Sequence, residues 1–314
     1  MKKQMSAMVI QKTMGVFIAF FLSGCAAPSL TQIGALSKGA SLLAEDSKKA
    51  LELINSSAID RKMYDVAADS AQSPTDATFE GLFKEPFSTA YRIRVALLEK
   101  LSSYAKALEN LATADFRKDV DAASAELFGS ISCLCSSYKK ATSQEIPFTD
   151  DHLKIIAAGI EAIGNAIVEV KRRRAIKTIV IQTDTVVQKV VKLLENDFGK
   201  DSDFSQLVQQ NLLNAQGSLG QAYNAQRTTQ HSTFDSRYAM LVKIRRMHDA
   251  AKTSPQLFEN ISAGSKKVGE AHAALRIAVT KNKFSSAELS AKIGEIVEYV
   301  KFIDSFYEKI GSRN

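Results

Sequence analysis

Residues 285–311 read SSAELSAKIGEIVEYVKFIDSFYEKIG, and this stretch indicates the fold more clearly than any other part of the chain. Its apolar residues recur at alternating spacings of three and four, at Leu289, Ile293, Ile296, Val300, Ile303, Tyr307 and Ile310. Such spacing places them along one side of an α-helix that packs lengthwise against other helices. Ser285 and Glu288 fit a capping box at its start, and Gly311 fits a stop at its end.

The same kind of spacing recurs upstream and predicts further helices. The two longest patterns cover residues 149–196 and 203–250, and these two helices are candidates for a central hairpin. Residues 175–181 are rich in β-branched side chains and also fit a strand, but their helical flanks favour a helix. Ser254 and Pro255 fit the N-cap and first position of another helix.

Turn-forming residues are scarce and positioned in a way that favours helices. The chain has 15 glycines and five prolines, and every proline falls between two helical patterns. Short connections favour antiparallel neighbours. We therefore predict an all-α fold, an elongated up-and-down antiparallel bundle of six or seven helices. The bundle is expected to occupy residues 31–314, as one unit or as two packed halves, 31–146 and 147–314.

The first 25 residues are of a different kind. Lys2, Lys3 and Lys12 accompany an apolar run from residue 14 to 22, which is far shorter than the about 20 residues that span a membrane. The run leads into Leu22-Ser23-Gly24-Cys25. A basic start, a short apolar run and small residues before a cleavage site characterise a secretory signal. This stretch resembles the signal peptide and lipobox of bacterial lipoproteins.

The resemblance implies that residues 1–24 are removed by cleavage between Gly24 and Cys25, and that Cys25 carries a diacylglycerol group and an N-acyl chain. Each buried CH₂ of such chains contributes about 0.8 kcal/mol, so several acyl chains hold a protein firmly on a bilayer. In enteric-type bacteria an Asp directly after the lipidated cysteine tends to retain a lipoprotein in the inner membrane. Here Ala26 occupies that position, which favours a location on the outer membrane, facing the periplasm. The alternatives are an ordinary cleaved signal, or a poor membrane helix, with Cys25 incidental.

The predicted tether is short. Ser29-Leu30-Thr31-Gln32 fits a capping box with Ser29 as the N-cap, which leaves residues 25–30 as a lipid-proximal tether. At about 3.4 Å per extended residue, the folded part is expected within roughly 15 Å of the bilayer.

Charge limits the partners. The chain has 41 Lys and Arg against 34 Asp and Glu, and without Lys2, Lys3 and Lys12 the balance is 38 against 34, a net +4. So mild a charge behind a signal peptide argues against nucleic acid as a partner. We expect a lipid bilayer, contacted through Cys25, and an envelope protein as partners.

The sequence contains no motif for a metal or cofactor, and we expect none besides the lipid on Cys25. None of the four histidines (His152, His231, His248 and His272) follows a Glu by three residues, as a ferritin-like dimetal site requires. Phosphate-binding and nucleophile-elbow motifs are also missing. His272 lies on an apolar stripe and is expected to be a hydrogen-bonded core residue. If carboxylates lie near it in the fold, His272 is also the first candidate for a catalytic residue in a cleft between helices.

Two other groups are weaker candidates. Cys133 and Cys135 lie two residues apart on a predicted helix, so their side chains diverge by about 200° and cannot bond to each other. Two small buried side chains are the first interpretation, and a metal clip, a redox pair or an inter-chain disulfide are the alternatives. The run Lys171-Arg172-Arg173-Arg174 fits a solvated face with salt bridges to its neighbours, or a contact with anionic lipid or cell-wall groups.

These observations favour a membrane-anchored helical module that binds or scaffolds an envelope component and is not an enzyme. One alternative is an enzyme with a cryptic cleft between helices. The other is a helical pore-forming or membrane-perturbing protein, although apolar stretches after Cys25, such as residues 155–160, are soon interrupted by charged or amide side chains.

Overall fold

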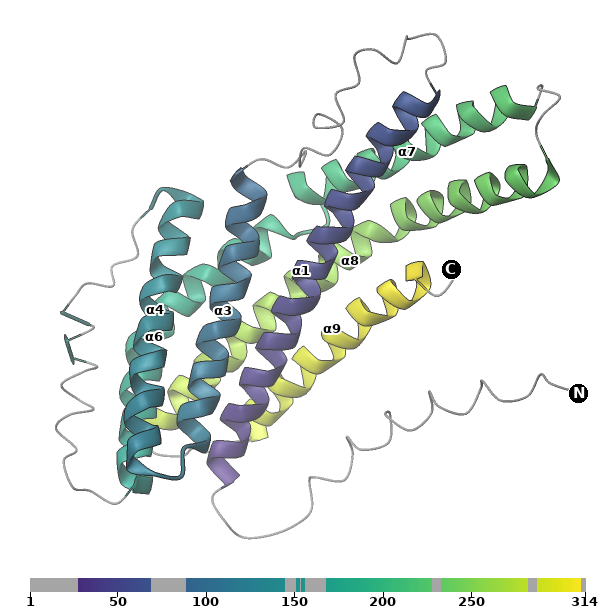
Figure 1. The fold of residues 1–314 in the computed structure, drawn as a ribbon. Helices are drawn as coiled ribbons and strands as arrows, with labels where there is room; N and C mark the ends of the chain where they lie inside the picture. Colours follow the sequence, from purple (N-terminus) through teal and green to yellow (C-terminus); the bar gives the residue numbers. More distant parts are fainter. Residues whose placement is uncertain are drawn as a thin grey trace, which may run out of the picture.

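The computed structural model describes residues 28–68, 89–144, 151–152, 154–155, 168–227, 233–281 and 287–311. The helices within these ranges are α1 (Pro28–Ala68), α3 (Thr89–Thr113), α4 (Arg117–Thr142), α6 (Val168–Asp197), α7 (Asp203–Arg227), α8 (Phe234–Thr280) and α9 (Ala287–Gly311), shown in Figure 1. The prediction of an all-α bundle is confirmed. Residues 175–181 lie inside α6, so the strand alternative is wrong.

Helix α1 is the centre of the bundle. Its 41 residues are about 60 Å long at 1.5 Å per residue, and it packs against α3, α7, α8 and α9. Helices α3 and α4 form an antiparallel pair on one side, and α4 also contacts α6. Helix α8, with 47 residues, runs along α7 at its start and along α6 and α9 further on (Figure 1).

Two neighbouring pairs run parallel. The start of α4 meets the start of α6 through an ion pair between Asp121 and Lys171, and the start of α1 meets the start of α9 through a hydrogen bond from Gln32 to Ser290. Helices α6 and α7 follow one another along α8, so the expected central hairpin of the two longest helices is wrong (Figure 1).

The predicted helix at 203–250 is two helices. Helix α7 ends at Arg227 and α8 begins at Phe234, after an N-cap at Thr233 whose hydroxyl accepts a hydrogen bond from the Ser236 amide. Residues 224–233 are almost entirely polar, so they offer nothing for a continuous helix to bury. The predicted helix at 149–196 corresponds to α6 from Val168 onward, and residues 156–167 lie outside the described residues.

The predicted helix start at Ser254 and Pro255 is also wrong, because both residues lie inside α8. Proline has no amide proton and would leave the carbonyl of Ala251 without its helical partner. Here the buried hydroxyl of Ser254 donates to that carbonyl at 3.1 Å. The helix therefore continues through the proline with this acceptor satisfied.

The amino end of α1 differs in detail from the prediction. The helix begins at Pro28, so Ser29 lies within it and is not an N-cap. Gln32 donates a hydrogen bond to the Ser290 hydroxyl of α9 at 2.5 Å. The signal peptide, Gly24 and Cys25 lie outside the described residues.

Candidate functional site

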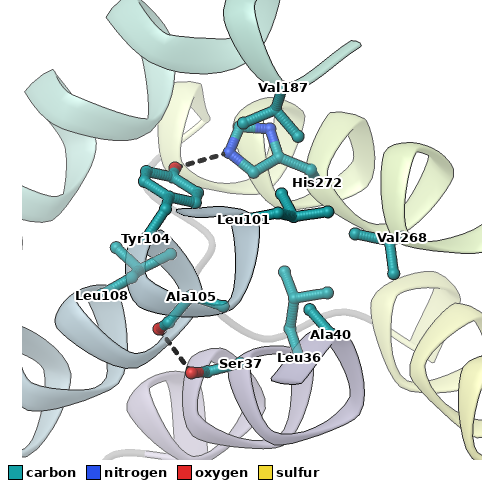
Figure 2. Close-up of a pocket in the computed structure, with 10 residues that line it drawn as sticks. All are labelled: Leu36, Ser37, Ala40, Leu101, Tyr104, Ala105, Leu108, Val187, Val268 and His272. Carbon is teal, nitrogen blue, oxygen red and sulfur yellow. Dashed lines mark hydrogen bonds between the residues drawn. The ribbon is translucent and has the colours of Figure 1, made fainter. Parts of the chain in front are cut away.

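His272 is the centre of a buried polar network. Its side chain on α8 is 2% exposed, as expected for a core residue, and it joins two other helices. Its Nε2 atom lies 2.8 Å from the Tyr104 hydroxyl on α3, and its Nδ1 atom lies 2.9 Å from Asp184 Oδ1 on α6 (Figure 2 shows the first contact). The expected hydrogen-bonded core histidine is confirmed.

The network continues from Tyr104 into the core. The Tyr104 hydroxyl is also 2.9 Å from the Thr183 hydroxyl, which donates to the backbone carbonyl of Ile179, again at 2.9 Å. Both Tyr104 and Thr183 are buried. Three helices with no sequence proximity are thus held together by consecutive hydrogen bonds.

At the other end the network approaches the surface. Asp184 Oδ2 lies 2.9 Å from Arg276 Nε, one turn beyond His272 on α8. Gln188 donates to Asp184 Oδ1 at 3.3 Å and to the Gly269 carbonyl at 2.9 Å. Donors therefore surround the carboxylate from both α6 and α8.

These surroundings set the charges of the network. Burial alone opposes ionisation of Asp184, but the hydrogen bonds from His272 and Gln188 and the positive charges near it outweigh burial and lower its pKa. Burial is the main influence on Tyr104 and raises its pKa, so the phenol keeps its proton. The network holds a carboxylate at its outer end and a neutral phenol at its inner end.

A small cavity of about 20 Å³ lies beside Tyr104 and His272 (Figure 2). Most of its lining is aliphatic and comes from α1, α3, α6 and α8, with Leu36, Ala40, Leu101, Leu108, Val187 and Val268. Such a volume accommodates about one water molecule. A His–Asp pair is suited to general base catalysis, but this cavity has no room for an organic substrate beside it.

A second candidate site is an exposed stripe on the first turns of α8. Phe234, Tyr238 and Leu241 are 71%, 60% and 44% exposed, and their spacing of four and three places them on one face of the helix. The rings of Phe234 and Tyr238 stack at 6.1 Å between centroids. The residues of α8 that enter the core, such as Leu257 and Ile261, lie on the opposite face.

The stripe lies in a basic segment. Residues 234–252 carry five Lys and Arg and two Asp, a net +3 with His248 neutral, and Arg245 and Lys252 continue the stripe along the exposed face. Figure 1 shows this part of α8 beside α7, at the end of the bundle remote from the start of α1. We call Phe234, Tyr238, Leu241, Arg245 and Lys252 the α8 stripe.

The two cysteines of α4 have different environments. Both are free thiols; Cys133 is exposed, and Cys135 is half-buried against the hydrophobic core. Burial raises the pKa of Cys135 to about 11. The expectation of two buried side chains is therefore wrong for Cys133, because Ile131 and Leu134 occupy the inward positions of this turn.

The basic run of α6 changes from buried at Lys171 to exposed at Arg174. Lys171 is 3% exposed and pairs with Asp121 on α4, and Arg172 donates to the Ala114 carbonyl at 2.8 Å. Arg173 pairs with Glu169 at 2.5 Å, and Arg174 is exposed. The predicted salt bridges are confirmed. The prediction of a solvated face is wrong for Lys171, which is buried and fixes α6 to α4.

Sequence reasoning found His272 and missed most of both sites. Tyr104 and Asp184 lie 168 and 88 residues from His272, and no local pattern connects them. Phe234 and Leu241 have the same spacing as core residues, so their exposure is not visible in the sequence. The polar break before Phe234 was the one available signal that the packing changes there.

Among the described residues, no helix is long and apolar enough to cross a membrane. Within the same ranges, no group of three or more His, Cys, Asp or Glu side chains is placed to hold a metal ion. No protein-family model, curated protein or solved structure matches the chain.

Proposed function

We propose that this chain is a bacterial lipoprotein, anchored through Cys25 to the outer membrane and facing the periplasm, that acts as a non-enzymatic binding or scaffolding module. The α8 stripe is its binding surface, and an envelope protein is its partner. The exposed stripe is the observation that carries the binding role, because contiguous exposed apolar side chains commonly mark interaction sites.

The anchor is supported by the lipobox, and the position of α1 sets the distance between the bundle and the bilayer. Only Ala26 and Ala27 separate Cys25 from Pro28, the first residue of α1. Three residue steps span roughly 10 Å, so a lipid on Cys25 keeps the start of α1 beside the bilayer. The α8 stripe is at the other end of the bundle, with the length of α1 between them (Figure 1).

The chemistry of the stripe indicates the kind of partner. Apolar side chains at positions i, i+4 and i+7 are the anchors by which a helix enters a hydrophobic groove. The net positive charge of residues 234–252 favours a partner whose groove has an acidic rim. An apolar groove with acidic margins on an envelope protein fits both features.

The anchor is tested by the Cys25→Ser substitution in the native host. We expect the wild type to incorporate an alkyne-tagged fatty acid and to fractionate with membranes. The Cys25→Ser chain should incorporate no label and appear in the soluble periplasmic fraction. Cys133→Ser is the control and should behave as the wild type does. A Cys25→Ser chain that remains membrane-bound to the same extent contradicts the anchor.

The binding surface is tested with a photo-crosslinking amino acid at Tyr238 in native envelopes. The cross-linked protein is identified by mass spectrometry, purified and titrated against the purified chain. We expect the Phe234→Ser, Leu241→Ser double variant to bind it at least tenfold more weakly, because two apolar anchors are lost. Phe302→Ser on α9, where the side chain is also exposed (56%), is the matched control and should bind normally.

Two results contradict this role for the stripe. One is a partner that binds the double variant and the wild type equally. The other is a purified Cys25→Ser chain that co-sediments with phosphatidylglycerol vesicles through the stripe while no protein cross-links to Tyr238, since the stripe is then a lipid contact.

A further inference from the structure

The number of protons available in the buried network constrains the charge of His272. Four contacts form a linear series: Asp184 to His272, His272 to Tyr104, Tyr104 to Thr183, and Thr183 to the carbonyl of Ile179. Each contact needs one proton between its two heavy atoms. Ionised Asp184 and the Ile179 carbonyl have none to give, since both only accept.

The remaining three side chains supply either three protons or four. Tyr104 and Thr183 have one hydroxyl proton each, and a neutral imidazole has one. A neutral His272 therefore leaves one of the four contacts without a proton. An imidazolium ion supplies a proton from each ring nitrogen, and all four contacts are then satisfied.

We propose that the junction of α3, α6 and α8 is a proton-binding site, in which His272 is held doubly protonated between Asp184 and Tyr104. In this arrangement Nδ1–H donates to Asp184, Nε2–H donates to the Tyr104 oxygen, and the Tyr104 hydroxyl donates to Thr183. The Thr183 hydroxyl donates in turn to Ile179. The proposal does not depend on the proposed function.

The charges around His272 are suited to an imidazolium ion. Helix α6 presents the carboxylate of Asp184, helix α3 presents neutral Tyr104, and helix α8 itself presents Arg276 on the far oxygen of Asp184. Helix α1 contributes Leu36, Ser37 and Ala40 to the adjoining cavity and no titratable group there. A buried ion pair whose remaining polar atoms are hydrogen-bonded avoids most of the cost of burying a charge.

The second ring proton determines how many hydrogen bonds the helix junction can make. When His272 loses it, the contact series is one proton short, and either the Tyr104–Thr183 or the Thr183–Ile179 hydrogen bond is lost. Tyr104 is a buried polar contact of α3 with both α6 and α8. Where the Tyr104–Thr183 hydrogen bond is the one lost, the attachment of α3 to α6 is weakened.

The test is the protonation state of the His272 ring nitrogens in the full chain, carrying Cys25→Ser to keep it free of lipid. Long-range ¹⁵N–¹H correlation spectra are recorded at pH 7, with His272→Gln for assignment. We expect two protonated ring nitrogens on His272. A single proton on Nδ1 in this chain overturns the proposal, whatever the variants show.

The variant Thr183→Val gives the sharper prediction. Valine preserves the shape and removes the hydroxyl that accepts the Tyr104 proton and donates to Ile179, so the Tyr104 hydroxyl turns to donate to Nε2. We expect His272 to become neutral, with a large downfield shift of the Nε2 signal. Thr253→Val is the matched control, because it removes a hydroxyl with the same i−4 backbone bond outside the network and should leave His272 unchanged. A folded Thr183→Val chain with an unchanged His272 spectrum contradicts the proposal.

Discussion

The side chain of Leu43 on α1 occupies the space that a Cβ atom on Gly264 of α8 would need. An ideal Cβ on Gly264 would lie 2.8 Å from Leu43 Cδ1 and 3.3 Å from Tyr299 Cβ on α9. Gly39 is in a similar position, with Ile296 Cγ2 at 3.0 Å. Helix α8 therefore approaches α1 and α9 closely at Gly264, and α1 approaches α9 closely at Gly39, because a glycine has no side chain there.

We expect Gly264→Ala to lower the free energy of unfolding by about 1–3 kcal/mol, because the added methyl forces Leu43 and the helices apart. Gly294→Ala on α9 is the matched control, since no atom lies within 4 Å of its ideal Cβ. That variant should gain about 0.5–1 kcal/mol from helix propensity. Urea denaturation of both variants measures the difference, and equal effects would contradict the close approach.

Ser254 and Pro255 provide a double-mutant cycle. We expect Ser254→Ala to destabilise the chain by about 1–2 kcal/mol, because it leaves the buried Ala251 carbonyl without a donor. In a Pro255→Ala background the restored amide donates to that carbonyl, so Ser254→Ala should then have little effect. Chemical denaturation of the four chains gives the coupling. If Ser254→Ala lowers the free energy of unfolding equally in both backgrounds, the Ser254 hydroxyl does not compensate for the amide that Pro255 lacks.

Acid stability should depend on Asp184. Its pKa is lower in the folded chain than in the unfolded chain, so its contribution is complete above the unfolded pKa of about 3.9 and is lost as the pH falls toward the folded value. We expect the stability of the wild type to fall more steeply between pH 5 and 3 than that of Asp184→Asn. Thermal denaturation across this range measures both. Parallel curves for the two chains would show that Asp184 is not stabilised as an anion.

The two thiols of α4 should differ in reactivity. Cys133 is exposed, whereas the pKa of Cys135 is about 11, which leaves only about one thousandth of it as thiolate at pH 8. We expect iodoacetamide to modify the Cys135→Ser chain rapidly and the Cys133→Ser chain at least tenfold more slowly, both in a Cys25→Ser background. Mass spectrometry of timed samples gives the rates, and similar rates would contradict the burial of Cys135.

The helical architecture was predictable because it depends on local periodicity. The spacing in α9 and the scarcity of turn residues need no knowledge of distant residues. The helix boundary near residue 230 and the continuation of α8 through Pro255 were not predictable, for opposite reasons. Residues 224–233 are compatible with a helix in their spacing, but their side chains are almost all polar and offer little for a core to bury. Pro255 opposes a helix interior, but the adjacent Ser254 satisfies the carbonyl that the proline leaves without its helical donor.

The candidate sites were less predictable because they depend on which helices become neighbours. The position of His272 on an apolar stripe predicts burial, but its partners Tyr104 and Asp184 are determined by the arrangement of α3, α6 and α8. The inward orientation of Lys171 has the same origin, because Asp121 meets it only when α4 and α6 run parallel. The exposure of Phe234 depends equally on the absence of a covering helix among the described residues.

The central position of α1 has a mechanical consequence. A pulling force on the amino end of this helix is applied directly to a member that contacts α3, α7, α8 and α9. Detaching α1 would therefore require shearing several long interfaces at once, whereas a peripheral helix such as α4 could be peeled away from fewer neighbours. A chain pulled by the amino end of α1 is therefore expected to unfold only when the interfaces of α1 with these four helices separate together.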